Sequence, residues 1–374
     1  MNKKILFILG TRPEAIKVAP VILAIKKSAN YDVKVCTTGQ HREILKQVLD
    51  FFDIVPDIVL ESMEINQTLA QLSSKLFKEV GLIFETYRPD LVIVHGDTTS
   101  AMVGAMVGFY NRIKVGHIEA GLRTFNKFSP FPEEINRQVI SRVTDYHFAP
   151  TINAATVLKQ EGVDDINIIV TGNTVIDALF IGVEKVQSET FNNKQIKYLE
   201  STLDFSKKIV LVTGHRRENF GGGFVNICEA LLEVSELENI QIVYPVHPNP
   251  NVQDPVNKYL SNNDNIVLCD PLDYPAFIWL MKKANIILTD SGGIQEEAPS
   301  LKVPVLVLRD TTERPEAIAT GHIKLVGTDK IKIVKEVKHL LNNDEYYSSF
   351  SKSENPYGDG KSSEIILSYI EKNL

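Results

Sequence analysis

The sequence predicts an α/β protein in which two Rossmann-like domains face a cleft. Its length of 374 residues exceeds what one ordinary hydrophobic core needs, so two domains are expected. Short apolar runs alternate with helix-like segments along most of the chain, a pattern typical of βαβ units around a parallel sheet. Two pairs of similar segments assign one such sheet to each half of the chain.

The expected strands are apolar runs, each followed by a turn or a polar segment. They cover residues 5–9, 33–36, 91–94, 113–115, 209–212, 240–244, 286–288 and 303–308. Because one series of strands ends near residue 172 and the polar stretch 187–208 separates it from the next, we place the domains at 1–172 and 173–360. The residues after 355 read as a turn followed by a short helix.

The two halves resemble each other at two places. KKILFILGTRPE at 3–14 and KKIVLVTGHRRE at 207–218 each contain a lysine pair, an apolar strand, a glycine and a polar turn. PDLVIVHGDTTS at 89–100 and ANIILTDSGGIQ at 284–295 are apolar strands that reach an aspartate beside small residues. Two domains of one kind explain both pairs, and a general likeness among α/β strands is the alternative.

Composition argues against several classes of protein. With 44% hydrophobic and 23% charged residues, and no apolar run near the roughly 20 residues of a membrane span, we expect a soluble protein. The apolar run between Lys4 and Gly10 is too short for a secretory signal, which makes the cytoplasm the expected location. The net charge of −7 without a basic block argues against nucleic acid as a partner.

Neither a metal nor a cofactor is expected. Cys36, Cys228 and Cys269 lie far apart without a CxxC pair, so we interpret them as buried thiols. The histidines show no HExxH spacing, and the chain has neither a GxGxxG nor a P-loop pattern. The glycines 221–223 are expected to form a mobile loop over the cleft.

Polar clusters follow nearly every expected strand. Ligands of open parallel sheets bind beyond the carboxyl ends of the strands, where loops converge and helix N-termini point inward. One cluster, Ser291-Gly292-Gly293, precedes a helix expected to begin near Ile294, so its backbone N–H groups would bind a phosphate. Glu297 would then accept ribose hydroxyls. The alternative is an ordinary serine N-cap with a glutamate in the first turn.

Three carboxylates are candidates for acid and base chemistry. Asp97, Glu119 and Glu133 follow apolar strands or a proline-rich loop, and clustering should raise the pKa of at least one of them. A buried salt-bridge network with Arg123 and Arg137 is the alternative. The cations available to offset a diphosphate are Arg12, Lys17, His215 and Arg314, each of which is otherwise a solvated surface charge.

The chain resembles the non-hydrolysing UDP-N-acetylglucosamine 2-epimerases of bacteria and archaea nearly from end to end. The shared motifs are GTRPEAIK at 10–17, QHRE at 40–43, HGDTTS at 95–100, GHIEAGLRT at 116–124, PFPEEINRQ at 130–138, TGNTVIDAL at 171–179, GHRRENFG at 214–221, DSGGIQEEAPS at 290–300, RDTTERPE at 309–316 and NPYGDG at 355–360. So many long motifs in one order make coincidence an inadequate explanation.

This resemblance implies a GT-B-like fold of the UDP-glycosyltransferase and glycogen phosphorylase type, with UDP held mainly by the second domain. It also implies a homodimer and a C-terminal helix, 361–374, that packs back on the first domain. The positions that match catalytic residues are Asp97, Glu119, Glu133 and His215. The positions that match substrate contacts are Arg12, Lys17, Leu272, Phe277, Ser291, Gly292, Gly293, Glu297 and Arg314.

Some members of the family bind a second UDP-N-acetylglucosamine as a regulator. Gln40, Glu43 and His247 match the segments that they use for it. Asn66 stands where those members have an arginine, and Leu272 stands where some members have glutamine.

The implied reaction is reversible epimerisation at C2 of UDP-N-acetylglucosamine to UDP-N-acetylmannosamine, for cell-surface polysaccharide synthesis. Because C2 is not next to a carbonyl, its proton is too weakly acidic for simple removal. Elimination of UDP to 2-acetamidoglucal and re-addition of UDP avoids this difficulty, and no dinucleotide pattern supports an oxidation. The alternatives are a GT-B glycosyltransferase with a UDP-sugar donor, a hydrolysing epimerase and a nucleotide-sugar sensor without turnover.

Overall fold

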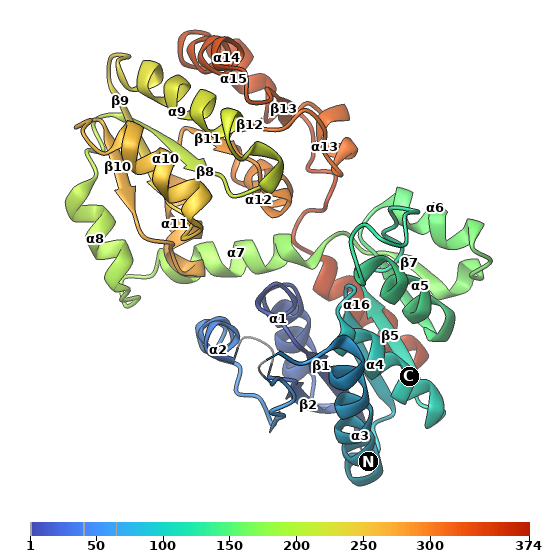
Figure 1. Ribbon diagram of the computed structural model, residues 1–374. Coiled ribbons are helices and arrows are strands. Elements are labelled where there is room, and N and C mark those ends of the chain that lie inside the picture. The colour runs from blue at the N-terminus through green and yellow to red at the C-terminus, as the bar shows by residue number, and fades with distance from the viewer. Residues whose placement is uncertain (1, 40–41, 65) are drawn as a thin grey trace. The chain divides into compact units, whose positions relative to one another are not determined.

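The computed structural model describes residues 2–39, 42–64 and 66–374, and the chain divides into two compact units (Figure 1). The first unit comprises Met1–Ala178 and Tyr357–Leu374, and the second comprises Leu179–Pro356. Helix α7 (Thr174–Val186) crosses the boundary between them. The predicted domain limits at residues 172 and 360 stay a prediction.

The first unit contains a parallel sheet with the strand order β3-β2-β1-β4-β5-β6-β7. The strands are β1 (Lys3–Leu9), β2 (Tyr31–Thr37), β3 (Ile58–Val59), β4 (Leu91–His95), β5 (Lys114–Ile118), β6 (Tyr146–Ala149) and β7 (Ile168–Val170). The helices are α1 (Arg12–Lys27), α2 (Arg42–Phe51), α3 (Leu69–Tyr87), α4 (Thr99–Tyr110), α5 (Glu133–Val143), α6 (Ile152–Gln160), the 3₁₀ helix η1 (Asp165–Asn167) and α16 (Ser362–Asn373).

The second unit contains a parallel sheet with the order β10-β9-β8-β11-β12-β13. The strands are β8 (Lys208–Thr213), β9 (Ile240–Pro245), β10 (Ile266–Cys269), β11 (Ile286–Thr289), β12 (Val305–Val307) and β13 (Ile323–Leu325). The helices are α8 (Lys194–Thr202), η2 (Arg217–Asn219), α9 (Gly222–Ser235), α10 (Pro250–Leu260), α11 (Tyr274–Lys283), α12 (Gly292–Glu297), η3 (Ala298–Leu301), α13 (Pro315–Ala319), α14 (Lys330–Asn342) and α15 (Asp344–Ser349).

The two sheets share one topology. From the third strand of each unit the order runs back to the first and then on to the fourth, as in Rossmann folds. The paired segments of the sequence occupy equivalent places, because β1 and β8 are the first strands and β4 and β11 lie beside them. The predicted α/β class with two Rossmann-like sheets is therefore confirmed.

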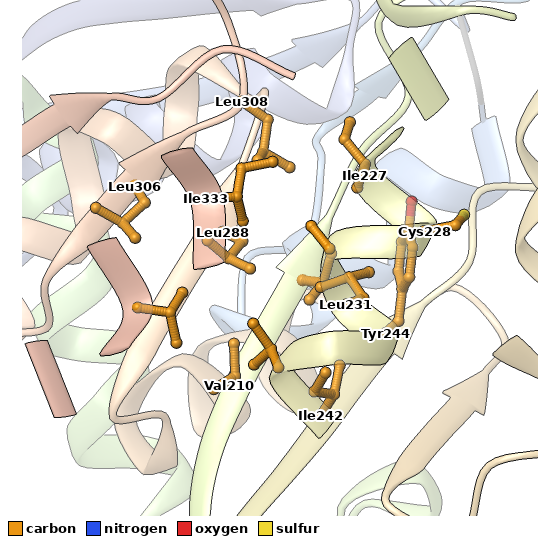
Figure 2. Packing of buried hydrophobic residues seen from close by; sticks show 14 of the residues in the cluster. Val210, Ile227, Cys228, Leu231, Ile242, Tyr244, Leu288, Leu306, Leu308 and Ile333 are labelled. Carbon is orange, nitrogen blue, oxygen red and sulfur yellow. The ribbon is translucent and has the colours of Figure 1, made fainter. Parts of the chain in front are cut away.

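Buried aliphatic side chains hold each sheet to its helices. In the second unit one cluster joins strand residues such as Val210 and Leu288 to Leu231 of α9 and Ile333 of α14, and Figure 2 shows part of it. These four side chains are completely buried. Strands covered on both faces need continuous apolar runs, which explains why the sequence of β8 and β11 reads as it does.

The C-terminal helix α16 belongs to the first unit and packs against α1. The buried Asp177 carboxylate accepts the Ser363 backbone N–H at 2.8 Å and the Ser363 hydroxyl at 2.6 Å, at the positive end of α16. The backbone N–H of Asn173 donates to the Tyr357 carbonyl at 2.7 Å. A Cβ at Gly172 would approach Ser362 Oγ to 2.8 Å, so this seam requires a glycine.

Two local expectations are wrong. Strand β5 extends to Ile118 instead of ending at residue 115, because Gly116 continues the ladder between Ile93 of β4 and Tyr146 of β6. The glycines at 221–223 form no free loop: Gly221, with φ of +79°, precedes α9, and Gly222 and Gly223 begin that helix.

The three cysteines are free thiols, of which Cys36 and Cys228 are buried and Cys269 is half-buried. Of the helices in the described ranges, none has both the length and the apolar character that a bilayer crossing requires. Within the same ranges no three side chains of His, Cys, Asp or Glu are arranged to hold a metal ion.

Candidate active site

Both sheets present their polar loops at the same topological position. In each sheet the strand order reverses between two neighbours, β1 and β4 in the first and β8 and β11 in the second. Loops leave the carboxyl ends of such a pair in opposite directions, and ligands of open α/β sheets bind in the crevice that results. Several of the predicted site residues lie in the segments that follow these four strands.

The loop between β1 and α1 is held by the carboxylate of Glu14. Its Oε2 atom accepts the backbone N–H groups of Gly10 and Thr11 at 3.1 and 2.7 Å, and its Oε1 atom accepts the Thr98 hydroxyl at 2.9 Å. Glu14 therefore occupies the anion-binding N-terminus of α1 and ties this loop to the loop after β4. A Cβ at Gly10 would lie 2.6 Å from Ser100 Oγ, so the close approach requires glycine.

Burial raises the pKa of Glu14 from its ordinary 4.5 to about 7, although hydrogen bonds from Thr11, Thr98 and Gly10 oppose this rise. The folded protein thus binds the Glu14 proton more tightly than the unfolded chain does. The stability from this proton is fully present below the unfolded pKa and is lost as the pH rises through about 7.

We therefore expect a pH-dependent difference between the wild type and Glu14→Gln. The free energy of unfolding of the wild type should fall relative to that of the variant by up to about 3 kcal/mol between about pH 5 and about pH 8. Urea titrations followed by circular dichroism measure this difference. Glu85→Gln, at an exposed position of α3, is the matched control. A difference that stays constant across this range contradicts the assignment.

Glu119 follows β5 directly and has a left-handed φ of +64°, which is uncommon for a residue with a side chain. Its Oε2 atom forms an ion pair with Lys17 of α1, accepts the Asn173 amide at 3.4 Å and lies 3.7 Å from His95 Nε2. The side chains of Glu119 and Lys17 are 13% and 14% exposed. The carboxylate therefore lies just inside the surface of the first unit, within reach of a bound molecule.

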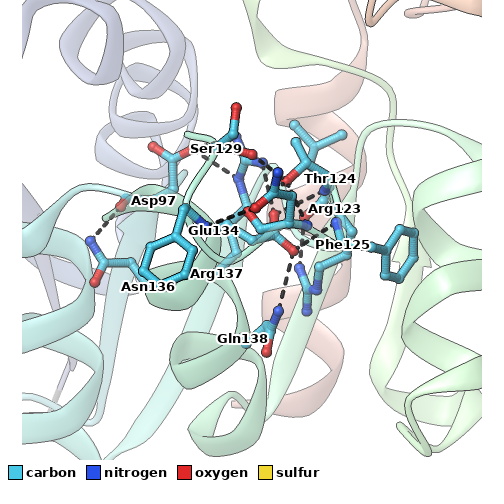
Figure 3. A network of polar contacts seen from close by, with 12 residues as sticks. Asp97, Arg123, Thr124, Phe125, Ser129, Glu134, Asn136, Arg137 and Gln138 are labelled. Atoms are coloured by element: carbon cyan, nitrogen blue, oxygen red, sulfur yellow. Dashed lines mark hydrogen bonds and ion pairs between the residues drawn. The ribbon is translucent and has the colours of Figure 1, made fainter. Parts of the chain in front are cut away.

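Asp97 follows β4 and is bound by Arg137 of α5. The Nε and Nη2 atoms of Arg137 donate to Asp97 Oδ2 at 2.9 and 2.7 Å, and the Asn136 amide donates to the Asp97 carbonyl at 2.8 Å. Figure 3 shows Arg137 between Asp97 and Glu134. The structural alternative was a salt-bridge network with Arg123 and Arg137. Arg137 does pair with Asp97, whereas Arg123 pairs with Glu161.

The two adjacent glutamates of the proline-rich loop differ in role. Glu134 is completely buried and accepts the backbone N–H groups of Thr124 and Phe125 at 2.9 and 3.2 Å, which folds the loop back onto α5. Burial would raise the pKa of Glu134, but these hydrogen bonds and one from Gln138 outweigh it and lower the pKa. Glu133 begins α5 and is half-buried, and its carboxylate has no hydrogen bond or ion pair with the part of the chain that the structure describes.

His215 lies beyond β8 in the second unit and is oriented by the buried Asp290. Asp290 Oδ2 accepts the backbone N–H groups of His215 and Arg216 at 2.9 and 2.8 Å and the Asn219 amide at 3.3 Å. His215 Nδ1 lies 3.4 Å from Asp290 Oδ1, and its ring stacks on that of His247 with centroids 5.5 Å apart. Burial lowers the pKa of His215, while Asp290 opposes this effect, so the imidazole is neutral near pH 7.

The segment after β11 carries the predicted phosphate contacts. Helix α12 begins at Gly292, two residues earlier than expected, and Ser291 is its N-cap residue, although the serine side chain makes no capping hydrogen bond within the described residues. The nearest atoms to a Cβ built at Gly292 and Gly293 lie 3.5 and 3.6 Å away. Arg314 pairs with the buried Glu296, which holds the guanidinium on one side of this segment. Glu297 ends α12 and is half-buried.

The segment with the predicted substrate contacts Leu272 and Phe277 precedes and begins α11. Leu272 and Phe277 are half-buried, and Asp273 caps the helix by accepting the Ala276 backbone N–H at 2.9 Å. The Asn193 amide donates to the other oxygen of Asp273 at 2.8 Å. This segment is thus fixed by side-chain hydrogen bonds within the second unit.

The positions of the predicted regulatory residues do not test whether they bind a regulator. Gln40 lies outside the described residues. Glu43 is exposed in the first turn of α2 in the first unit, and His247 is exposed in the second unit, where it stacks on His215. Arg12 is exposed at the first position of α1. A contact between His247 and a candidate catalytic group was not expected from the sequence.

Several residues that position the candidate groups were not predicted from the sequence. They are Glu14, His95, Glu134, Asp290 and Arg309. Arg309 is buried and donates to Glu313 at 2.7 Å, and Glu313 in turn accepts from Arg216 at 3.3 Å. The available signal in the sequence was a charged residue next to an apolar run. Such a residue is buried, and buried charged groups are almost always paired.

Two parallel sheets with alternating helices, and polar loops at both switch points, define an α/β protein with a GT-B-like fold. A family model described as UDP-N-acetylglucosamine 2-epimerase matches residues 23–371. The chain belongs to this family, which confirms the resemblance noted in its sequence.

Individual relatives are similar along their whole length. The UDP-N-acetylglucosamine 2-epimerase of Salmonella typhimurium is 50% identical over 369 residues, 98% of each chain. A crystal structure of UDP-GlcNAc 2-epimerase from Neisseria meningitidis bound to UDP-GlcNAc is 47% identical, with a TM-score of 0.88 over 99% of this chain and 100% of that chain. The enzyme of Methanocaldococcus jannaschii in complex with UDP-GlcNAc and UDP is 35% identical, with a TM-score of 0.78 over 99% and 100% of the two chains.

Proposed function

We propose that this protein is a non-hydrolysing epimerase that interconverts UDP-N-acetylglucosamine and UDP-N-acetylmannosamine. The observation that carries the proposal is the pair of carboxylates after β4 and β5, Asp97 and Glu119, each held by a cation at the carboxyl ends of strands of the first sheet. Membership of the family supports the choice of substrate. No redox cofactor takes part in the proposed reaction.

The reaction consists of an elimination and its reversal. A carboxylate removes the proton from C2, the electrons of the C2–H bond form the C1=C2 double bond, and the C1–O bond breaks with its electron pair on the β-phosphate of UDP. A second acid then delivers a proton to the opposite face of C2 while UDP adds back to C1. Atoms and charge balance without a co-reactant, and each face of C2 needs its own acid or base.

We assign proton exchange at C2 to Asp97, Glu119 and Glu133 of the first unit. Glu119 has the position of a group that exchanges protons, since its carboxylate is largely buried and yet reaches the surface. The ion pair with Lys17 holds this carboxylate in place before the substrate binds. Glu133, free of any ion pair within the described residues, is the candidate for the second face.

We assign recognition of UDP to the second unit. Ser291, Gly292 and Gly293 lie at the N-terminus of α12, Arg314 supplies a positive charge, and Glu297 supplies acceptors for the ribose hydroxyls. Leu272 and Phe277 would contact the uracil ring. His215 would assist the departure of the diphosphate, as a neutral imidazole that donates a hydrogen bond to the developing negative charge. Arg12 and Lys17 of the first unit would add positive charge.

An NMR time course with UDP-N-acetylglucosamine alone in D₂O tests this proposal. The expected result is conversion to UDP-N-acetylmannosamine without any acceptor, with deuterium at C2 of the product. A glycosyltransferase or a sensor leaves the substrate unchanged, and a hydrolysing epimerase releases free UDP. Retention of the original hydrogen at C2 contradicts the elimination and favours a hydride shuttle.

A homodimer, a cytoplasmic location, a role in supplying cell-surface polysaccharide synthesis and a regulatory site at Gln40, Glu43 and His247 are further parts of the proposal, and they rest on the family resemblance. Light scattering tests the dimer and should give twice the chain mass of 41.9 kDa. A rise in turnover with substrate concentration that is steeper than hyperbolic, abolished by Glu43→Ala, would support the regulatory site.

A further inference from the structure

The buried imidazole of His95 has no assigned role in proton exchange or in UDP binding. His95 is the last residue of β4 and is 3% exposed. Neither of its ring nitrogens has a hydrogen-bond partner within the described residues. A buried polar group without a partner destabilises a fold, so native proteins rarely keep one that serves no purpose.

The surroundings of His95 leave one candidate partner for its Nε2 atom. That atom lies 3.7 Å from Oε2 of Glu119, the same oxygen to which Lys17 is bound. A shift of less than one ångström, by rotation of the Glu119 side chain, brings this pair to ordinary hydrogen-bond length. On the neighbouring strand, His117 donates its Nε2–H to the Gly96 carbonyl oxygen, 2.7 Å away, so it does not compete for Glu119.

We propose that His95 is a positioning residue, which donates its Nε2–H to Glu119 when Lys17 leaves that carboxylate to bind the diphosphate of the substrate. The proposal rests on the proposed function, since it needs an anionic substrate that attracts Lys17. The two donors then act in turn on one oxygen: Lys17 before the substrate binds, and His95 while Glu119 exchanges its proton.

Burial supports a neutral donor in this place. It lowers the pKa of His95 to about 4, and the nearby Lys17 acts in the same direction while Glu119 opposes it. A neutral imidazole carries one N–H, so it can hold Glu119 in place without the charge that would keep the carboxylate from accepting a proton. Among the described residues, Lys17 of α1 and His95 of β4 lie beside the Glu119 carboxylate, and His117 of β5 lies next to His95.

The test compares His95→Gln, which keeps an N–H at the Nε2 position, with His95→Leu, which removes it. We expect His95→Leu to lower kcat for epimerisation about 10- to 100-fold and to move at least one limb of the kcat profile to higher pH, because a carboxylate that loses a donor gains affinity for protons. His95→Gln should restore kcat to within about threefold of the wild type. The affinity for UDP, measured by calorimetry, should stay within about threefold in both variants.

The contrary result is an unchanged pH profile in His95→Leu, or an equal loss of kcat in both variants, either of which overturns the proposal. If His95→Leu does not fold, nitrogen NMR of the wild-type histidines with UDP decides the matter. The His95 Nε2 resonance should then show a bonded proton, and a bare Nε2 contradicts the proposal.

Failure of the proposed function is distinguishable from failure of this inference. A wild type that does not epimerise UDP-N-acetylglucosamine removes the function, whereas an active wild type with an insensitive His95→Leu variant removes only the role of His95.

Discussion

Replacing Glu119 with glutamine should lower kcat for epimerisation by about 10²- to 10⁴-fold and leave the affinity for UDP within about threefold of the wild type. Glutamine has the same shape, and its carbonyl oxygen still accepts a hydrogen bond from Lys17. It cannot accept a proton from C2, so the variant loses the chemical step and keeps the fold. The left-handed backbone at Glu119 is equally available to glutamine, so no strain is added.

The measurement is a pair of assays on each variant. NMR time courses give kcat, and calorimetric titration with UDP gives the dissociation constant. Glu85→Gln, an exposed glutamate of α3, is the control for loss of one negative charge in the same unit. A Glu119→Gln variant with turnover close to the wild type would remove Glu119 from the acid and base assignment.

Replacing Asp290 with alanine should destabilise the second unit by about 3–5 kcal/mol and disable His215 at the same time. The Asp290 carboxylate is completely buried and accepts hydrogen bonds from His215, Arg216 and Asn219. Alanine leaves the backbone N–H groups of His215 and Arg216 without this acceptor, while the Asn219 amide keeps the Leu308 carbonyl at 3.1 Å. Because the His215 ring also loses its neighbour at Nδ1, its orientation becomes free and kcat should fall with stability.

Tryptophan fluorescence measures this effect on one unit alone. The chain has a single tryptophan, Trp279, which is buried in α11 of the second unit. Its emission during urea unfolding therefore reports on the unit that contains Asp290. Asp254→Ala, at an exposed position of α10, is the matched control. Equal urea midpoints for Asp290→Ala and the wild type would show that this carboxylate does not stabilise the second unit.

Several strands were predictable because they depend on local patterns. Continuous apolar runs identify β1, β4, β8 and β11, and the paired segments assign them to equivalent places in two sheets. Some strands of two to four residues were missed, among them β3, β10 and β13. So few residues carry no periodicity, and their pairing with a neighbour is what makes them strands.

The partners of the site residues were less predictable, because they depend on contacts between distant parts of the chain. Arg137 lies 40 residues from Asp97, and Ser363 lies 186 residues from Asp177, so no spacing in the sequence links them. Which of Glu133 and Glu134 is available as an acid or base also depends on such distant contacts. Only the folded loop shows that Glu134 is occupied by backbone N–H groups while Glu133 has no such contacts within the described ranges.

Part of the expected ion-pair network exists, while the expected site stays a prediction. Asp97 is bound by Arg137, as the structural alternative required, whereas Glu119 is bound by Lys17, which that alternative did not include. Arg123 fits only the structural alternative, since it pairs with Glu161 away from these carboxylates. A raised pKa among Asp97, Glu119 and Glu133 stays a prediction. Burial raises the pKa of Glu14, which was not part of that cluster.

The most direct test of the central claim follows the oxygen that joins C1 of the sugar to UDP. UDP-N-acetylglucosamine with ¹⁸O in this bridging position is incubated with the protein, and the label is located by phosphorus NMR. Breaking of the C1–O bond frees the β-phosphate to rotate before UDP adds back, so we predict that the label appears in non-bridging positions of recovered substrate and product. A label that stays in the bridge while epimerisation proceeds would contradict elimination and re-addition of UDP.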